Sequence, residues 1–192
     1  MKKFELTTEF ITNAFGKKLF RIKALVEFGN VKAGELGGYV EKEGNISQGG
    51  NAWVYDNAWV SGDAWVYGNA RVSGNARVYG NARVYDNARV SGDAWVYGNA
   101  RVSGNARVSG DAWVYGNADY ALVQGFGTEF RCTTFYRDKN KKIMVNCGCF
   151  HGDLEEFRKR VKKTRNGKIA KEYLTIADLM EYHFASEDSS DE

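Results

Sequence analysis

The sequence contains no proline, and only three cysteines and two histidines among 192 residues. A small, odd number of cysteines does not fit the disulfide framework of a secreted domain, so we expect reduced thiols. The formal charge of +3 is too close to neutrality to require a nucleic-acid partner. No apolar run reaches the roughly 18 residues of a membrane span, and residues 1–15 lack the apolar core of a signal peptide. We therefore expect a cytoplasmic protein with no membrane or nucleic-acid partner.

What the sequence has in abundance is a repeat of six residues. Twelve units follow one another from Gly50 to Ala121, and eleven of them read Gly/Asp–Asn/Asp–Ala–Trp/Arg–Val–Tyr/Ser. Successive side chains of a strand point to opposite faces, so Ala and Val are predicted to face inward and Trp or Arg outward. The Gly/Asp–Asn/Asp pair supplies a turn. A short strand and a turn, repeated without insertion, predict a coil.

The pattern of a small Ala two residues before a branched Val resembles the hexapeptide-repeat proteins, in which three units close one turn of a left-handed parallel β-helix. Units that begin at Gly38 and Gly44 keep the spacing but lose the sequence, as terminal repeats do. We predict a mainly β protein with a small α+β C-terminal domain. Its expected parts are an N-terminal cap over 1–37, the β-helix over 38–121, the C-terminal domain over 122–185, and an acidic disordered tail over 186–192.

With three units per turn, residues eighteen apart lie above one another, and the outward residues fall into three columns. The first face carries Trp53, Arg71, Arg89 and Arg107; the second face carries Trp59, Arg77, Trp95 and Trp113; the third face carries Trp65, Arg83, Arg101 and Asp119. All five tryptophans of the chain occupy these outward positions. A contiguous exposed aromatic patch is typical of an interface. Two alternatives to an interface are open. Arg side chains could stack on the Trp and Tyr rings of the same chain without any binding partner, or a ligand could bind along one face.

The second face is predicted to be the most aromatic, because tyrosines follow its outward positions. The candidate oligomer interface is therefore Trp59, Trp95, Trp113, Tyr97 and Tyr115. Hexapeptide β-helices commonly associate as trimers, so the resemblance implies a homo-oligomer, with a trimer favoured.

Two groups of basic residues are candidates for binding an anionic partner. Arg71, Arg89 and Arg107 should repeat at each turn of the first face, about 5 Å apart. Like charges at that spacing repel unless a ligand compensates, and Arg suits phosphate or carboxylate. The second group, on a predicted helix that follows the N-cap Asp153, is Arg158, Arg160 and Lys163. Screening by water, counter-ions or the acidic tail is the alternative for both groups.

The C-terminal region is predicted to hold two strands, at 130–136 and 143–150, followed by two helices. The first helix should bury Leu154, Phe157 and Val161 and end at Asn166-Gly167. The second is expected to open at Thr175. Its inward residues are predicted to be Ile176, Leu179 and Met180.

Two kinds of chemistry can be considered. Four residues could act as soft ligands for zinc: Cys132, Cys147, Cys149 and His151. The spacing is poor for zinc, because a one-residue gap on a strand puts both Cys147 and Cys149 on one face but too far apart. The alternative is that the cysteines are reduced and packed as small apolar side chains.

Hexapeptide-repeat acyltransferases use a histidine on or beside the coil and a loop inserted into it. Here both histidines follow the repeat, and residues 50–121 contain no insertion. We expect no cofactor and no catalysis.

A more specific resemblance joins the repeats to the stretch Cys-Gly-Cys-Phe-x-Gly-x-Leu-Glu-Glu-Phe at 147–157. Together with the Gly-rich entry at 34–40, it is similar to uncharacterised hexapeptide-repeat proteins of bacteriophages and prophages. The resemblance implies a protein of the bacterial cytoplasm and brings no established active site. The function that we expect is a non-enzymatic, phage-encoded counter-defence factor that binds a host protein or sequesters an anionic nucleotide. The alternatives are an acyltransferase and a purely structural oligomeric scaffold.

Overall fold

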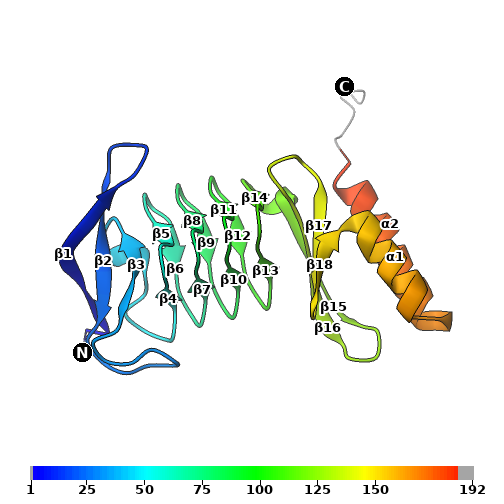
Figure 1. Cartoon of the computed structure of the whole chain (residues 1–192), viewed down its shortest axis with the longest axis horizontal. Helices are drawn as coiled ribbons and strands as arrows, with labels where there is room; N and C mark the ends of the chain where they lie inside the picture. Colours follow the sequence, from blue (N-terminus) through cyan, green and yellow to red (C-terminus); the bar gives the residue numbers. More distant parts are fainter. Residues whose placement is uncertain (1, 186–192) are drawn as a thin grey trace. The chain divides into compact units, whose positions relative to one another are not determined.

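The computed structural model describes residues 2–185. The chain divides into two compact units, unit 1 (Met1–Asn117) and unit 2 (Ala118–Glu192). Unit 1 contains a parallel β-solenoid of about four turns, and unit 2 contains an antiparallel sheet with two helices (Figure 1). The protein is therefore mainly β, as the repeat predicted.

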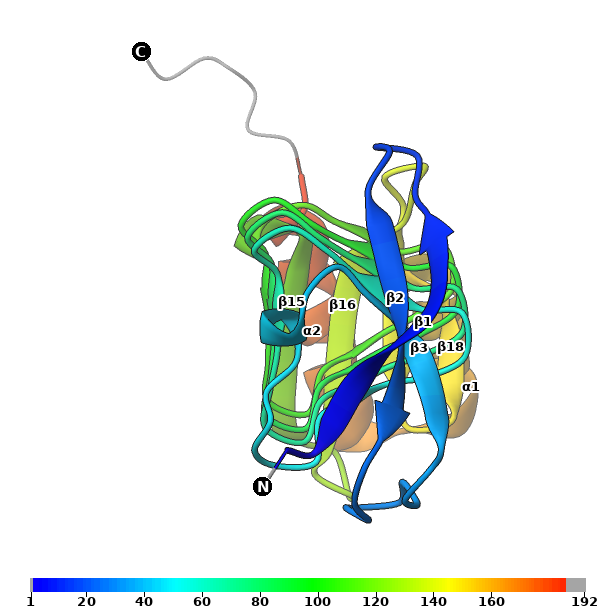
Figure 2. The same cartoon turned by 90° about the vertical axis from the view of Figure 1, so that its left-hand side faces the viewer.

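The solenoid is built from eleven strands of two residues each, and each strand is the Trp/Arg–Val pair of one repeat. The strands are β4 (Trp53–Val54), β5 (Trp59–Val60), β6 (Trp65–Val66), β7 (Arg71–Val72), β8 (Arg77–Val78), β9 (Arg83–Val84), β10 (Arg89–Val90), β11 (Trp95–Val96), β12 (Arg101–Val102), β13 (Arg107–Val108) and β14 (Trp113–Val114). Every third strand pairs in parallel, which gives the sheets β4-β7-β10-β13, β5-β8-β11-β14 and β6-β9-β12. Seen along the solenoid, successive turns superpose (Figure 2).

The solenoid core consists of two kinds of residue. Every Ala at the third position and every Val at the fifth position, from Ala52 to Val114, is at most 1% exposed. The interior is therefore filled by one small and one branched side chain per strand. Burial of this apolar surface stabilises the coil, by roughly 25 cal/mol per Å² removed from water.

The turns between strands need a backbone with positive φ at the first position of the unit. Glycine occupies most of these positions, but Asp56 and Asp86 adopt φ values of 54° and 57°. Their carboxylates accept hydrogen bonds from the backbone N–H groups of Gly74 and Gly104, eighteen residues further on, at 2.9 and 3.1 Å. Aspartate tolerates this conformation better than most residues, and the hydrogen bond offsets part of its cost.

Three longer strands extend one of the solenoid sheets at its N-terminal end. They are β1 (Phe4–Thr12), β2 (Lys18–Ala24) and β3 (Leu36–Val40), and the sheet order is β1-β2-β3-β5-β8-β11-β14. Strand β3 pairs in parallel with β5, with Tyr39 opposite Trp59 and Val40 opposite Val60. Tyr39 and Trp59 are twenty residues apart in the sequence, as are Ile46 and Val66, so the divergent units at Gly38 and Gly44 stack on the coil two residues out of its eighteen-residue register.

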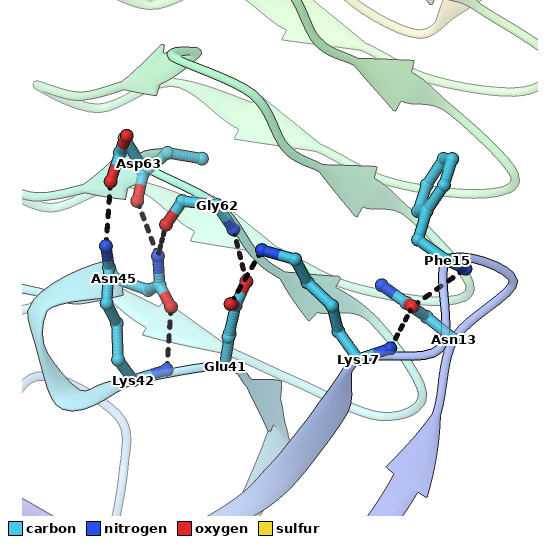
Figure 3. Close-up of polar contacts among 9 residues, drawn as sticks. Asn13, Phe15, Lys17, Glu41, Lys42, Asn45, Gly62 and Asp63 are labelled. Carbon is cyan, nitrogen blue, oxygen red and sulfur yellow. Dashed lines mark hydrogen bonds and ion pairs between the residues drawn. The ribbon is translucent and has the colours of Figure 1, made fainter.

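Polar side chains satisfy the backbone groups of the first turn. The amide of Asn45, in the short 3-10 helix η1 (Glu43–Asn45), donates to the carbonyl oxygens of Gly62 and Ala64 at 3.1 and 2.9 Å. Glu41 accepts from the amine of Lys17 at 2.8 Å and from the N–H of Gly62 at 2.7 Å (Figure 3). These hydrogen bonds and the neighbouring cations hold the pKa of Glu41 below its ordinary value, against the opposing effect of its burial.

Lys3 forms hydrogen bonds with backbone groups at another corner of the same first turn. Its amine donates to the carbonyl oxygens of Gly49, Gly50 and Ala52 at 3.5, 3.4 and 3.0 Å, and lies 4.7 Å from the centre of the Phe28 ring. The side chain is almost completely buried, and burial lowers the pKa of Lys3 to about 8. Lys3 thus supplies the donors that these carbonyl groups need in the absence of water.

Unit 2 has one antiparallel sheet in the order β15-β16-β17-β18. The strands are β15 (Tyr120–Phe126), β16 (Arg131–Arg137), β17 (Ile143–Cys147) and β18 (Phe150–Asp153), after the 3-10 helix η2 (Asn117–Asp119). The helices α1 (Leu154–Thr164) and α2 (Gly167–His183) lie on one side of this sheet (Figure 1). Neither helix, nor any other within residues 2–185, is apolar over a length that would cross a membrane.

Several details of unit 2 differ from the prediction. Strand β15 was not predicted, and the single strand predicted at 143–150 is two strands, β17 and β18, because Gly148 makes a turn between them with φ of 63°. The second helix begins at Gly167, with Asn166 as its N-cap residue, and not at Thr175. Leu179 is 56% exposed, whereas Ile176 and Met180 are buried as expected. The tail predicted to be disordered, 186–192, lies outside the described residues.

The first helix agrees with the prediction. Asp153 accepts a hydrogen bond from the N–H of Glu156 at 2.8 Å, and the Glu156 carboxylate accepts from the N–H of Asp153 at 2.9 Å. This is a capping box. Leu154, Phe157 and Val161 are buried against the sheet.

Candidate binding surfaces

The first face is the in-register row that the repeat predicted. Arg71 lies opposite Arg89, and Arg89 lies opposite Arg107, on the parallel strands β7, β10 and β13. Within residues 2–185, neither Arg71 nor Arg89 makes an ion pair or a side-chain hydrogen bond. The strands that carry these two arginines are about 4.8 Å apart, so two guanidinium groups without a carboxylate lie on neighbouring turns of the coil.

The start of this row is more enclosed than its continuation. Trp53 precedes Arg71 in the column, Arg71 is half-buried, and Arg89 and Arg107 are exposed. Burial raises the pKa of the neighbouring Tyr55 hydroxyl, and the positive charges of Arg71 and Arg89 oppose that rise. The positive field of the row thus reaches the adjacent corner.

The second face is an aromatic ladder. Trp95 stacks on Trp113 with ring centroids 5.4 Å apart, and Tyr79 stacks on Tyr97 at 5.1 Å. Tyr115 continues this row edge-on at 5.2 Å from Tyr97 and is 60% exposed. Burial, and then Tyr97, raise the pKa of Tyr79. The exposed part of the ladder is a rigid apolar strip, of the kind that associates with another surface.

Arg77 sits inside this ladder and is not available as a free cation. Its guanidinium lies 4.7 Å from the Trp95 ring and 5.8 Å from the Trp59 ring. This is the stacked Arg–Trp arrangement that was the alternative to an interface. The two descriptions are compatible, because stacking orders the rings and leaves their outer edges exposed.

The expectation that all five tryptophans are exposed is wrong for Trp53 and Trp59. Both point away from the coil interior, but residues outside the repeat cover them. Trp53 is completely buried, with Phe4 and Phe28 packed edge-on against it at 5.9 and 5.3 Å. Trp59 is 9% exposed and packs in a small cluster around Leu19. The second-face interface therefore has to be carried by Trp95, Trp113, Tyr97 and Tyr115.

Phe15 adds an aromatic side chain that the sequence did not indicate. It lies in the turn between β1 and β2, is 65% exposed, and its ring centroid is 5.8 Å from that of Tyr79. The close-up of this turn shows Asn13 accepting from the N–H groups of Phe15 and Lys17 (Figure 3). No local pattern connects residue 15 with residue 79, because only the pairing of β1 and β2 with the solenoid sheet brings them together.

The corners of the solenoid carry a second ladder, made of side-chain amides. Asn51 donates to Asn69 at 3.0 Å, and Asn69 donates to Asn87 at 3.1 Å, each across one turn. Another corner repeats the pattern from Asn81 to Asn99 at 3.2 Å. These hydrogen bonds link equivalent positions of successive turns and hold the three faces in register.

Arg158 does not fit its assignment to anion binding. Its guanidinium donates to Glu155 at 2.6 Å and to Asp178 and Glu181 at 2.7 Å each. Hydrogen bonds from the carboxylates, Glu181 first, raise the pKa of Arg158 above its already high ordinary value. Arg158 thus joins α1 to α2, and its charge is balanced by three carboxylates. Arg160 and Lys163 are exposed on α1 and border a shallow depression with His151.

The four soft ligands do not assemble into a metal site. Within residues 2–185, no group of three His, Cys, Asp or Glu side chains is placed to hold a metal ion. The Cys147 sulfur accepts a hydrogen bond from the Thr133 hydroxyl at 3.1 Å, and all three cysteines are reduced. The His151 ring is hydrogen-bonded to the Tyr136 hydroxyl at 3.0 Å.

Comparison with known proteins identifies the repeat. Six segments match the family model described as the YdcK beta solenoid repeat, at residues 52–68, 64–80, 70–83, 76–92, 82–98 and 100–116. The chain is a β-solenoid repeat protein. No curated protein matches it. The match covers the repeats alone, so it bears on the architecture of unit 1 and carries no activity.

Proposed function

We propose that this β-solenoid protein is a non-enzymatic binding protein that holds an anionic partner on its first face. The observation that carries the proposal is the in-register pair Arg71 and Arg89, which have no carboxylate partner in the described part of the chain. Arg107 continues the row by one turn. A guanidinium binds a carboxylate or phosphate through two parallel hydrogen bonds, so a rigid row of them suits a regularly spaced anionic surface.

The third face is less suited to this role. It carries only two arginines in register, Arg83 and Arg101. Beside it, Tyr67 stacks on Trp65 at 4.1 Å and on Tyr85 at 4.9 Å. The first face therefore presents the longest basic row of the solenoid. An acidic protein surface is the partner that it fits best, because carboxylates on a folded protein can match a rigid spacing.

Two finer features of the architecture belong to the same proposal. We infer a left-handed coil, because the six-residue period with three units per turn is similar to the hexapeptide-repeat proteins. The strands β1–β3, with Lys3 and Asn45, act as an N-terminal cap. Their contacts occupy the backbone groups of the first turn, which would otherwise be open to edge-to-edge association.

Self-association through the second face is the second part of the proposal. The exposed edges of Trp113 and Tyr115, 40% and 60% accessible, support it. A trimer built in this way would present three first faces to a partner, and simultaneous binding of several sites raises the overall affinity without new contacts.

The biological setting that we propose is counter-defence in a bacterial host. The similarity of the repeats and the 147–157 stretch to phage and prophage hexapeptide-repeat proteins supports it. In that setting the anionic partner on the first face is a host protein, and the protein acts by occupying it. An acyltransferase and a purely structural scaffold are the competing functions.

The test is a comparison of two double variants with equal loss of charge. Full-length protein, the first-face variant (Arg71→Gln with Arg89→Gln) and the third-face variant (Arg83→Gln with Arg101→Gln) are used to capture proteins from a bacterial lysate, with quantitative mass spectrometry. We expect one protein to be captured by the wild type and the third-face variant, and to be depleted at least about tenfold by the first-face variant, more strongly at low salt. Equal capture by both variants contradicts the proposal. Saturable binding of an acyl-coenzyme A favours the acyltransferase instead.

A further inference from the structure

Unit 2 contains a cavity of about 250 Å³ that no proposed role of the solenoid uses. It lies among residues of the β15–β16 turn, the β17–β18 turn and the two helices. Ligand pockets for small molecules usually have volumes of roughly 300–1,000 Å³. The cavity is slightly smaller than this range, so it suits a compact ligand and not an extended cofactor.

The rim of the cavity is strongly basic. Arg131, Arg160 and Arg165 line it, and Glu129 is its one acidic residue. The Glu129 carboxylate is 3.9 Å from the Arg131 guanidinium, at the outer limit of an ion pair. The Arg165 side chain donates to the carbonyl oxygen of Thr164, at 3.4 Å. The described residues give the Arg160 side chain no ion pair or hydrogen bond.

The inner wall of the cavity is aromatic. Phe157 and Tyr173 are 3% and 8% exposed and pack edge-on with ring centroids 5.9 Å apart. Phe150 packs on Phe157 at 5.5 Å. The Tyr173 hydroxyl donates to the carbonyl oxygen of Phe126 at 3.3 Å, which fixes its ring. A ligand in the cavity would thus have a rigid apolar surface on one side.

The positive charges of the rim also affect Tyr173 on the inner wall of the cavity. Burial raises the pKa of Tyr173, and Arg165 and Arg131 oppose that rise. Both arginines line the same cavity as Tyr173. Three cations, one carboxylate and an apolar wall make a site for a ligand that has both a doubly charged anionic group and a flat ring.

We propose that this cavity binds a nucleoside monophosphate. The phosphate would lie against Arg131, Arg160 and Arg165, which offer it paired donors, and the base would lie against Phe150. Arg131 and Arg165 stand on different sides of the cavity, since Arg131 begins β16 and Arg165 follows the last turn of α1. The site lies wholly within unit 2, so it does not depend on the function proposed for the solenoid.

Isothermal titration calorimetry on the full-length protein tests this site. The probes are the four ribonucleoside 5′-monophosphates, with inorganic phosphate and adenosine as the two partial ligands. We expect at least one monophosphate to bind at least about tenfold more tightly than either partial ligand. No binding of any monophosphate overturns the proposal, and so does phosphate that binds as tightly as the nucleotide.

Matched variants then locate the site. Arg160→Gln should raise the dissociation constant at least about tenfold, because it removes a charged donor to the phosphate. The Arg160 side chain is exposed, so the substitution should leave the fold intact. Lys162→Gln removes one charge from the same helix at an exposed position that does not line the cavity, and should change the dissociation constant less than about twofold. An equal effect of the two variants overturns the proposal. The first-face double variant should bind the nucleotide as the wild type does, which separates this result from the test of the solenoid.

Discussion

The indole rings of Trp95 and Trp113 stack one turn apart, with ring centroids separated by 5.4 Å and planes inclined by 25°. Both belong to strands of the same solenoid sheet, so the stack follows directly from the parallel register of β11 and β14. The rings cover each other on one side only. Their remaining surface, extended by Tyr115, is the part of unit 1 that we assign to self-association.

This assignment predicts a concentration-dependent oligomer. Sedimentation velocity at micromolar concentration should give a mass of three times the 21.5 kDa chain for the wild type. The double variant Trp113→Ala with Tyr115→Ala should dissociate at least about tenfold more readily, because it removes the most exposed rings. Trp65→Ala truncates a similarly exposed tryptophan on the third face and should leave the mass unchanged. A wild-type monomer at high micromolar concentration contradicts the assignment.

Much of unit 1 could be predicted from its sequence. The six-residue period gave the strands, the inward Ala and Val, and the three columns of outward residues, because each repeat interacts with its neighbours in the same way. The burial of Trp53 could not be predicted. It depends on Phe4 and Phe28, which reach it through chain pairings that no repeat encodes.

Unit 2 was predictable only in part, for a related reason. The capping box at Asp153 is local, so the sequence revealed it. The ion pairs of Arg158 with Asp178 and Glu181 join two helices across twenty or more residues, and the basic run on α1 looked like an open surface without them. The cavity rim is equally non-local, since Arg131 and Arg165 come from opposite ends of the unit's sequence.

The second prediction concerns Trp53. Its Nε1 atom is buried and has no hydrogen-bond partner among residues 2–185, so we expect its contribution to stability to come from packing. Trp53→Ala should lower the free energy of unfolding by about 3–5 kcal/mol. Trp53→Phe should cost clearly less, because it keeps a ring against Phe4 and removes the unpaired donor. Urea denaturation followed by circular dichroism measures both. Equal losses for the two variants would show that the indole nitrogen has a partner after all.

The third prediction concerns pH. Burial lowers the pKa of Lys3 to about 8 in the folded chain, below its ordinary value of 10.5. Between these two values the unfolded chain binds more protons than the folded chain, so stability should rise as the pH rises. The gain should approach, and not exceed, about 3 kcal/mol. Urea denaturation at pH 7 and pH 10 of the wild type and Lys3→Met measures it, and only the wild type should show this gain. A difference between the two proteins that does not change with pH would contradict the lowered pKa.

The fourth prediction concerns the aspartates at positive φ. Asp86→Ala removes both the tolerance of the left-handed backbone and the hydrogen bond to Gly104, so it should destabilise unit 1 by about 1–3 kcal/mol. Asp86→Gly loses the hydrogen bond but relieves the backbone, and should remain within about 1 kcal/mol of the wild type. Thermal unfolding of the three proteins decides the point. If the Gly variant were as unstable as the Ala variant, the hydrogen bond to Gly104 would account for most of the contribution of Asp86 to stability.

The Asn ladders have a consequence for the history of this gene. Asn51, Asn69 and Asn87 are chemically equivalent and lie eighteen residues apart, and each bonds to the next. Duplication or deletion of eighteen codons inside the repeat would therefore add or remove one whole rung and leave both ends of the solenoid intact. A length that is not a multiple of eighteen codons would bring the residues of one face above those of another and break the amide chains. Relatives of this protein should accordingly differ in length by whole rungs, with the spacing between surface features changing in steps of one strand separation.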